Sequence, residues 1–166
     1  SVVSLSLGHN AFTGTLPPEW GSRSALKSLD VQSNRLSGSL PREWFLLNLT
    51  LSSMYLNGNV LKGALPDEWK AFSSLQSLAL GDNQLSGTLP SSWAQMQSLT
   101  TVSLRNNAFS GSLPANWSRS PSLASIDLRG NQLTGGIPIS WTTMSALSFL
   151  DVSNNTLAGT LPTLWT

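Results

Sequence analysis

The stretch that decides the fold runs from Leu75 to Ser98 and reads LQSLALGDNQLSGTLPSSWAQMQS. Its leucines, asparagine, glycine, proline and tryptophan return along the whole chain at one spacing. Steps of 24 or 25 residues separate the asparagines Asn10, Asn34, Asn59, Asn83, Asn107, Asn131 and Asn155. The glycines and tryptophans keep the same count, from Gly14 to Gly159 and from Trp20 to Trp165. A unit of this length written seven times predicts a solenoid.

We expect residues 1–166 to form one array of seven units, of which the last is incomplete. The expected boundaries are 2–25, 26–50, 51–74, 75–98, 99–122, 123–146 and 147–166. The second unit carries one extra residue, which lies between Trp44 and Leu51. Because the chain opens inside a unit and stops just past Trp165, we expect caps and any targeting or anchoring segment to lie outside it.

Each unit opens with LxxLxLxxN, whose alternation predicts a strand of three or four residues. We expect these strands to stack in parallel about 4.8 Å apart, with the asparagines in an internal ladder that satisfies backbone groups at the turn. In the x-L-x-G-x-L-P section that follows, the glycine suits a positive φ and the leucine points inward. The proline favours a turn into a short 3-10 helix, where the tryptophan fills the space between the two sides.

Composition excludes several classes of protein. Charged residues make up 10% of the chain, with 9 Lys and Arg against 8 Asp and Glu, so there is no basic footprint for nucleic acid. No apolar run approaches the roughly 18 residues that cross a bilayer. With no cysteine present, disulfides and thiolate metal sites are excluded.

The full pattern, LxxLxLxxNxLxGxLPxxWxxLxx, resembles the leucine-rich repeat, and the LxGxLP section resembles its "plant-specific" subclass. The LPxxW units with tails such as PSSWAQMQSL and PISWTTMSAL resemble the repeats of trypanosomatid (Leishmania-type) surface antigens and membrane proteophosphoglycans. The resemblance implies an α/β repeat solenoid: a right-handed superhelix with a parallel concave β-sheet and short 3-10 turns on the convex side. It also implies an extracellular, often lipid-anchored glycoprotein that takes part in host interaction. Members of that group usually have cysteine-bearing flanks, and none is present here.

Catalytic material is scarce. His9 is the single histidine, and because no G-x-S-x-G pattern accompanies it, we interpret it as a surface residue after the first strand. Asp127 and Asp151 occupy equivalent strand positions in adjacent units, about 4.8 Å apart, which is compatible with a retaining glycosidase. Arg105 and Arg129 stand two residues further along their units, so we favour mutual charge compensation over catalysis. We therefore expect no catalytic site, no metal site and no cofactor.

Alternation also identifies the outward strand positions. One column is almost entirely hydroxylated, and we interpret it as a close-packed polar row. The neighbouring columns vary over a constant scaffold, which is typical of partner recognition. Since aromatic residues and arginine dominate binding hot spots, we predict that the anchors for a ligand are Tyr55, Arg105, Asp127, Arg129, Phe149 and Asp151.

Three N-x-[ST] sequons are candidate glycosylation sites, at Asn48, Asn116 and Asn154. Asn48 lies in the irregular 25-residue unit and is the favoured candidate. We expect Asn116 on the convex turn and Asn154 at a strand end, where a glycan would obstruct the concave face.

These patterns favour a non-catalytic extracellular module that recognises a protein or glycan. Two alternatives stay open: a rigid spacer in a surface coat, and a plant-type receptor or inhibitor ectodomain. Because both terminal strands would be exposed edges, we also expect end-to-end self-association.

Overall fold

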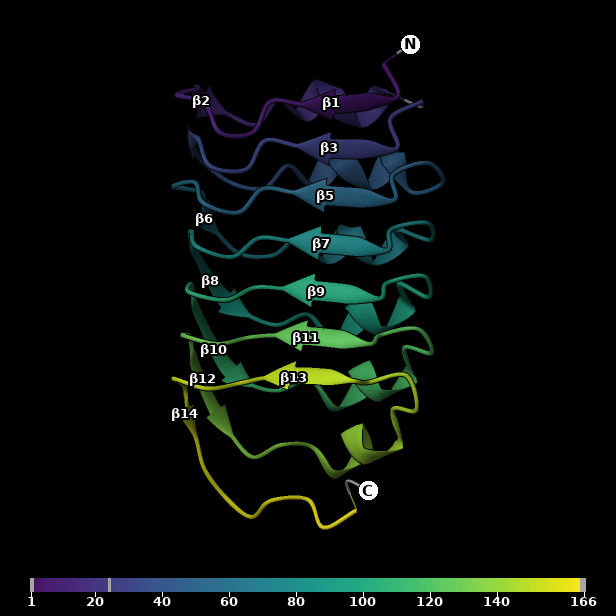
Figure 1. The fold of residues 1–166 in the computed structure, drawn as a ribbon, viewed down its shortest axis with the longest axis vertical. Coiled ribbons are helices and arrows are strands. Elements are labelled where there is room, and N and C mark those ends of the chain that lie inside the picture. The colour runs from purple at the N-terminus through teal and green to yellow at the C-terminus, as the bar shows by residue number, and fades with distance from the viewer. Residues whose placement is uncertain (1, 24, 165–166) are drawn as a thin grey trace.

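Short strands, one from each coil of the chain, form a parallel sheet along the length of the molecule (Figure 1). The computed structural model describes residues 2–23 and 25–164. The sheet has seven strands, each hydrogen-bonded to the next one in this series: β1 (Ser4–Ser6), β3 (Ser28–Asp30), β5 (Ser53–Tyr55), β7 (Ser77–Ala79), β9 (Thr101–Ser103), β11 (Ser125–Asp127) and β13 (Phe149–Asp151).

The central residue of each strand points into the core, as alternation predicts. These residues are in register with one another, and those away from the two ends of the sheet are at most 1% exposed: Leu29, Met54, Leu78, Val102 and Ile126. One strand could not bury such a side chain by itself. The core is therefore built by stacking, and it runs without interruption along the coils.

The predicted asparagine ladder is confirmed. Asn59 is typical: its Nδ2 donates to Leu56 O of its own turn at 3.0 Å and to Val31 O of the preceding turn at 3.1 Å. Its Oδ1 accepts the backbone N–H of Leu36 at 2.9 Å. Each such amide thus satisfies buried backbone groups in two coils at once, which explains why every unit has asparagine at this position.

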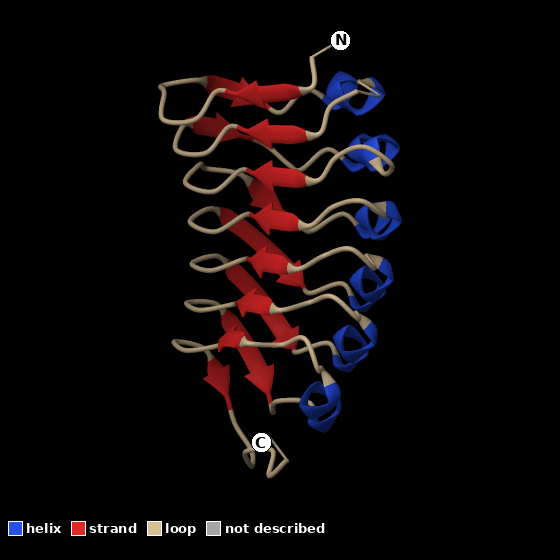
Figure 2. Cartoon of the chain, turned by 45° about the vertical axis from the view of Figure 1, so that its right-hand side comes forward, coloured by secondary structure: helices blue, strands red, loops and turns tan. Residues whose placement is uncertain are grey.

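A second set of parallel strands follows the asparagines, and it was not predicted. It comprises a two-stranded sheet, β2 (Thr13–Thr15) and β4 (Arg35–Ser37), and a five-stranded sheet of β6 (Lys62–Gly63), β8 (Gln84–Thr88), β10 (Ala108–Ser112), β12 (Gln132–Gly135) and β14 (Thr156–Leu157). In Figure 2 these strands lie behind those of the first sheet. The glycine in each LxGxLP section has a positive φ, for example +86° at Gly87, as expected.

Short 3-10 helices close the first six coils on the side away from the second set of strands (Figure 2). In the described part of the chain they are η1 (Pro18–Ser22), η2 (Arg42–Leu47), η3 (Asp67–Ala71), η4 (Ser91–Gln95), η5 (Ala115–Arg119) and η6 (Ile139–Thr143). All have five residues except η2, which has six and lies in the 25-residue unit. No helix within residues 2–23 and 25–164 is both long enough and apolar enough to cross a membrane.

The LPxxW pattern has a physical explanation in the stacking of coils. The carbonyl oxygen of Pro41 accepts the backbone N–H of Trp44 at 3.4 Å, which starts η2, and the indole N–H of Trp69 at 3.0 Å from the next coil. The indoles stack on one another, with 6.3 Å between the ring centroids of Trp44 and Trp69 and 6.2 Å between those of Trp69 and Trp93. The α/β repeat solenoid predicted from the sequence is thereby confirmed; Trp165 lies outside the described residues.

Candidate binding surface on the seven-stranded sheet

The outward face of the seven-stranded sheet and the turns that follow its strands carry the predicted anchors. Register places the first residue of every strand in one column, which reads Ser4, Ser28, Ser53, Ser77, Thr101, Ser125 and Phe149. Ser53 Oγ donates to Ser28 Oγ at 2.9 Å, as expected for a close-packed polar row. Phe149, on the last strand, ends the row and is 50% exposed.

Tyr55 lies half-buried in the next column, in register with Asp30 on one side and Ala79 on the other. Gln32 Nε2 donates to Asp30 Oδ2 at 3.1 Å, and Asn57 Nδ2 donates to Gln32 Oε1 at 3.3 Å. The phenol ring therefore has amide and carboxylate groups beside it in one direction and a small residue in the other. Such a ring can offer apolar contact and hydrogen bonds to the same ligand.

Arg105 is held across the gap between two coils. Its Nε and Nη2 both donate to Asp82 Oδ2 at 3.2 Å, while Asn106 Nδ2 donates to Asp82 Oδ1 at 2.7 Å. Gly81 makes this possible, because a Cβ at that position would lie 2.8 Å from Arg105 Cγ. The expected compensation of Arg105 by Asp127 or Asp151 is therefore wrong. The partner is Asp82, which is not among the predicted anchors.

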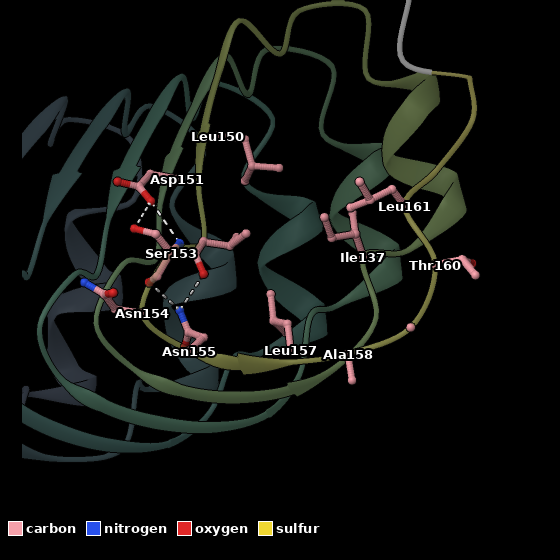
Figure 3. Close-up of a pocket in the computed structure, with 12 residues that line it drawn as sticks. Ile137, Leu150, Asp151, Ser153, Asn154, Asn155, Leu157, Ala158, Thr160 and Leu161 are labelled. Carbon is pink, nitrogen blue, oxygen red and sulfur yellow. Dashed lines mark hydrogen bonds between the residues drawn. The ribbon is translucent and has the colours of Figure 1, made fainter.

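Asp127 and Asp151 are direct neighbours in register, yet each accepts hydrogen bonds from its own surroundings. Asp127 accepts from the Arg129 backbone N–H and from Ser103 Oγ, both at 3.2 Å. Asp151 accepts from the Oγ of Ser153 at 2.6 Å and from its backbone N–H at 2.9 Å (Figure 3). The hydrogen bonds from Ser153, the hydroxyl first, lower the pKa of Asp151, to which the charge of Arg129 adds a smaller effect.

Asp151 does not suit the role of general acid. A general acid in a glycosidase needs a raised pKa, whereas the pKa of Asp151 is lowered. His9 is exposed, with a φ of +56°, in the turn after β1. Among the described residues no group of three or more acidic or histidine side chains is placed to hold a metal ion.

The anchors do not form one compact patch. Arg105, Asp127, Arg129 and Asp151 lie on or just after β9, β11 and β13, whereas Tyr55 lies on β5. Four strand spacings, ~19 Å, separate Tyr55 from the column position on β13. Within the described ranges Arg129 forms no ion pair and is exposed.

The sequons lie on different surfaces. Asn48 follows η2 and is half-buried, Asn116 lies exposed in η5, and Asn154 is exposed in the turn after β13 with a φ of +53°. Asn154 is thus close to the candidate binding surface, as expected, while the other two lie on the helical side.

At each end of the stack of coils, a hollow exposes apolar side chains of the kind that are buried in the core elsewhere. At the N-terminal end Leu5, Leu7 and Trp20 line about 500 Å³. At the C-terminal end a hollow of about 530 Å³ is lined by Leu150 and Leu157, among others (Figure 3).

Comparison with known proteins identifies the repeat. Family models described as leucine rich repeat match residues 1–22, 24–85 and 73–133. A search of curated proteins by sequence returns no match. Many solved structures are similar to this chain. The names of three of them show that proteins of this fold have different partners.

The plant peptide hormone receptor RGFR1 in complex with RGF2 is 27% identical, with a TM-score of 0.92 over 97% of this chain and 25% of that one. The BIR3–SERK2 complex from Arabidopsis thaliana is 33% identical, with a TM-score of 0.71 over 78% and 68%. A plant ice-binding protein is 26% identical, with a TM-score of 0.69 over 98% and 59%. The chain thus spans about a quarter of the peptide receptor. Since one fold serves these different partners, the surface has to decide the function.

Proposed function

Because the chain belongs to the leucine-rich repeat family, we propose that it is a non-catalytic recognition module whose seven-stranded face binds a protein, a peptide or a glycan. One observation carries this proposal. Over a backbone of constant register, the outward columns change from hydroxyls to an aromatic ring, carboxylates and guanidinium groups. A surface that only had to be soluble would not need this variation on one face.

The end of the face from β9 to β13 is the strongest part of the argument. There Arg129 is exposed and makes no ion pair with another described residue, and Phe149 is 50% exposed. Arginine and aromatic residues carry much of the energy in protein interfaces. The hydrogen bonds that hold Asp127 and Asp151 also fix their positions before a ligand arrives, which reduces the entropy lost on binding.

We place this module outside the cell, in a surface glycoprotein that takes part in host interaction, as its LPxxW units suggest. Similar structures include complexes of plant receptors, which supports an extracellular setting. A lipid anchor would have to come from a segment beyond these residues. We further propose end-to-end association through Leu5, Trp20 and Leu157 at the two hollows; light scattering that shows a strict monomer over a wide range of concentration would contradict it.

A rigid spacer without a dedicated ligand is the second candidate. The bare middle of the face favours it, because Ser77, Ala79 and Gly81 offer little to a partner. A plant-type receptor or inhibitor ectodomain is a special case of the first proposal.

The experiment that separates these candidates uses the immobilised protein as bait for a random peptide library and an array of immobilised glycans. We expect enrichment of peptides or glycans that is lost in a variant with Arg129→Ala and Phe149→Ala. The matched control is Arg42→Ala with Lys70→Ala, on the helical side, where binding should persist. Equal recovery of peptides or glycans on the unchanged protein, the double variant and the control would overturn the proposal. The rigid spacer would then be the remaining candidate.

A further inference from the structure

An exposed apolar segment interrupts the polar helical side of the molecule. In the 25-residue unit, Phe45 is 36% exposed, Leu46 56% and Leu49 75%. Large apolar side chains exposed together need a partner or a cover, since each contributes to nonspecific association. The segment Phe45–Thr50 reads FLLNLT and encloses the sequon Asn48-Leu49-Thr50.

The backbone places Phe45 and Asn48 on the same side of this segment. The Asn48 N–H donates to Phe45 O at 3.1 Å, and the Thr50 N–H donates to Leu47 O at 3.1 Å. In 3-10 geometry, residues three positions apart are eclipsed. Asn48 therefore lies over Phe45. Leu46 and Leu49 are exposed, whereas Leu47 is buried.

The Asn48 side chain has no role in holding the fold. Its amide makes no hydrogen bond to another residue of the described ranges, in contrast to the ladder asparagines such as Asn59. Its backbone groups are the ones used: the N–H donates to Phe45 O, and the oxygen accepts from the N–H groups of Ser73 and Ser74 and from Ser73 Oγ.

Thr50 supplies the second, independent observation. Its Oγ1 is buried and makes no hydrogen bond in the described part of the chain. A buried hydroxyl without a partner costs stability, and valine has the same shape without that cost. The hydroxyls of the other two sequons are used: Ser118 Oγ donates to Ala115 O at 2.9 Å and Thr156 Oγ1 to Leu133 O at 2.8 Å. The fold therefore gives no reason for a hydroxyl at Thr50, while the sequon requires one.

We propose that Asn48 is N-glycosylated and that the sugars nearest the chain lie over Phe45, Leu46 and Leu49. In the transfer, Asn48 Nδ2 bonds to the anomeric carbon of an oligosaccharide carried on a lipid pyrophosphate. The bond from that carbon to the pyrophosphate oxygen breaks, and the nitrogen loses a proton, so the lipid pyrophosphate leaves as the anion. The apolar face of the first sugar ring then packs on the Phe45 ring, and the polar edge of the sugar faces water.

The position leaves the candidate binding surface free. Asn48 follows η2 on the helical side, away from the strands that carry Tyr55 and Arg129. This inference rests on the proposed extracellular setting alone. Its test does not depend on whether the seven-stranded face binds a ligand.

The first test asks whether Asn48 carries a glycan. The protein is secreted from a eukaryotic host, and the mass of the peptide that contains Asn48 is measured before and after enzymatic removal of N-glycans. We expect a glycan on Asn48 that is lost in Asn48→Gln and in Thr50→Val and kept in Thr50→Ser. Asn116→Gln and Asn154→Gln serve as controls that leave it in place. Secreted protein whose Asn48 is unmodified would overturn the proposal.

The second test asks whether the glycan covers the exposed apolar segment. Enzymatic removal of the glycan from the folded protein should raise the fluorescence of a hydrophobic dye about twofold or more, since the segment becomes accessible. In a variant with Phe45→Ser, Leu46→Ser and Leu49→Ser, the same treatment should change the signal little. An equal response in both proteins would contradict packing of the sugar on this segment. Thr50→Val made without glycan should unfold at a higher temperature than the unglycosylated parent, and a lower temperature would remove the argument from the buried hydroxyl.

Discussion

Replacing Asn59 by alanine tests the asparagine ladder, which joins the seven-stranded sheet to the second set of strands. The residue is 7% exposed, and its side chain makes hydrogen bonds of 3.1 Å or less to three backbone groups. After the change, Val31 O still accepts from Asn34 Nδ2 at 3.0 Å, and Leu56 O still accepts from Asn83 Nδ2 at 3.1 Å. The buried Leu36 N–H, however, loses its acceptor.

The magnitude follows from these partners. An orphaned buried N–H costs about 1–3 kcal/mol, and the loss of two donated bonds to carbonyls that keep one partner adds about 1 kcal/mol. We therefore expect Asn59→Ala to lower the free energy of unfolding by about 2–4 kcal/mol, or the melting temperature by roughly 5–15 °C for a chain of this size. Urea unfolding followed by circular dichroism measures it.

The matched control is Asn57→Ala, two residues earlier. Asn57 is half-exposed, and its side chain donates one hydrogen bond of 3.3 Å to another side chain, that of Gln32. Its replacement should change the stability by about 0.5 kcal/mol or less. If the two variants were equally stable, the asparagine would not be the link between the sheets, and the reasoning would fail.

Further perturbations test other parts of the account. Trp69→Ala removes a fully buried indole that stacks on both neighbours, so it should lower the free energy of unfolding by about 3–5 kcal/mol in urea titrations; a loss below about 1 kcal/mol would refute the stacking argument. A double-mutant cycle on Arg105 and Asp82, both partly exposed, should give a coupling of about 1 kcal/mol or less that weakens with added salt; a larger, salt-independent coupling would contradict it. The pKa of Asp151, followed by NMR, should lie below the ordinary value for aspartate and rise in Ser153→Ala. Because this pKa is depressed in the folded state, ionised Asp151 stabilises the protein at pH values above the pKa that it has in the unfolded chain. That contribution is lost as the pH falls through the pKa of the folded state. Asp151→Asn should therefore make the free energy of unfolding fall less steeply at acid pH, and an unchanged fall would refute this.

Much of the coil could be predicted because it repeats. The positions of Leu, Asn, Gly, Pro and Trp are each fixed by one physical requirement, and seven copies separate them from the variable residues. Burial of Trp69, the positive φ of Gly87 and the hydrogen bonds of Asn59 all follow from that pattern. The boundaries of the seven units remain predictions from spacing.

The second set of strands was not predicted, although the sequence contains a pattern that indicates strands there. Leu85, Gly87 and Leu89 alternate with polar residues, which is the period of a strand. The glycine was expected at a positive φ and was not assigned to a strand. The strand accommodates the positive φ, since Gly87 has a φ of +86° and still pairs with Phe109 in β10.

The partner of Arg105 was missed for a different reason. Alternation assigns residues to columns within the strands, but Asp82 lies just beyond the strand, where a positive φ redirects the chain. Its contact with Arg105 also depends on the absence of a side chain at Gly81. Such a pairing between turns of adjacent coils follows from three-dimensional placement and not from the repeat count.

The most direct test of the recognition module is to map where a ligand binds. The isotopically labelled protein would be titrated with the best peptide or glycan from the selection experiment while backbone amide shifts are recorded by NMR. The account predicts that the shifts cluster on the seven-stranded sheet, from β9 to β13, with Arg129 and Phe149 among the largest. Shifts confined to the 3-10 helices or to the second sheet would contradict it.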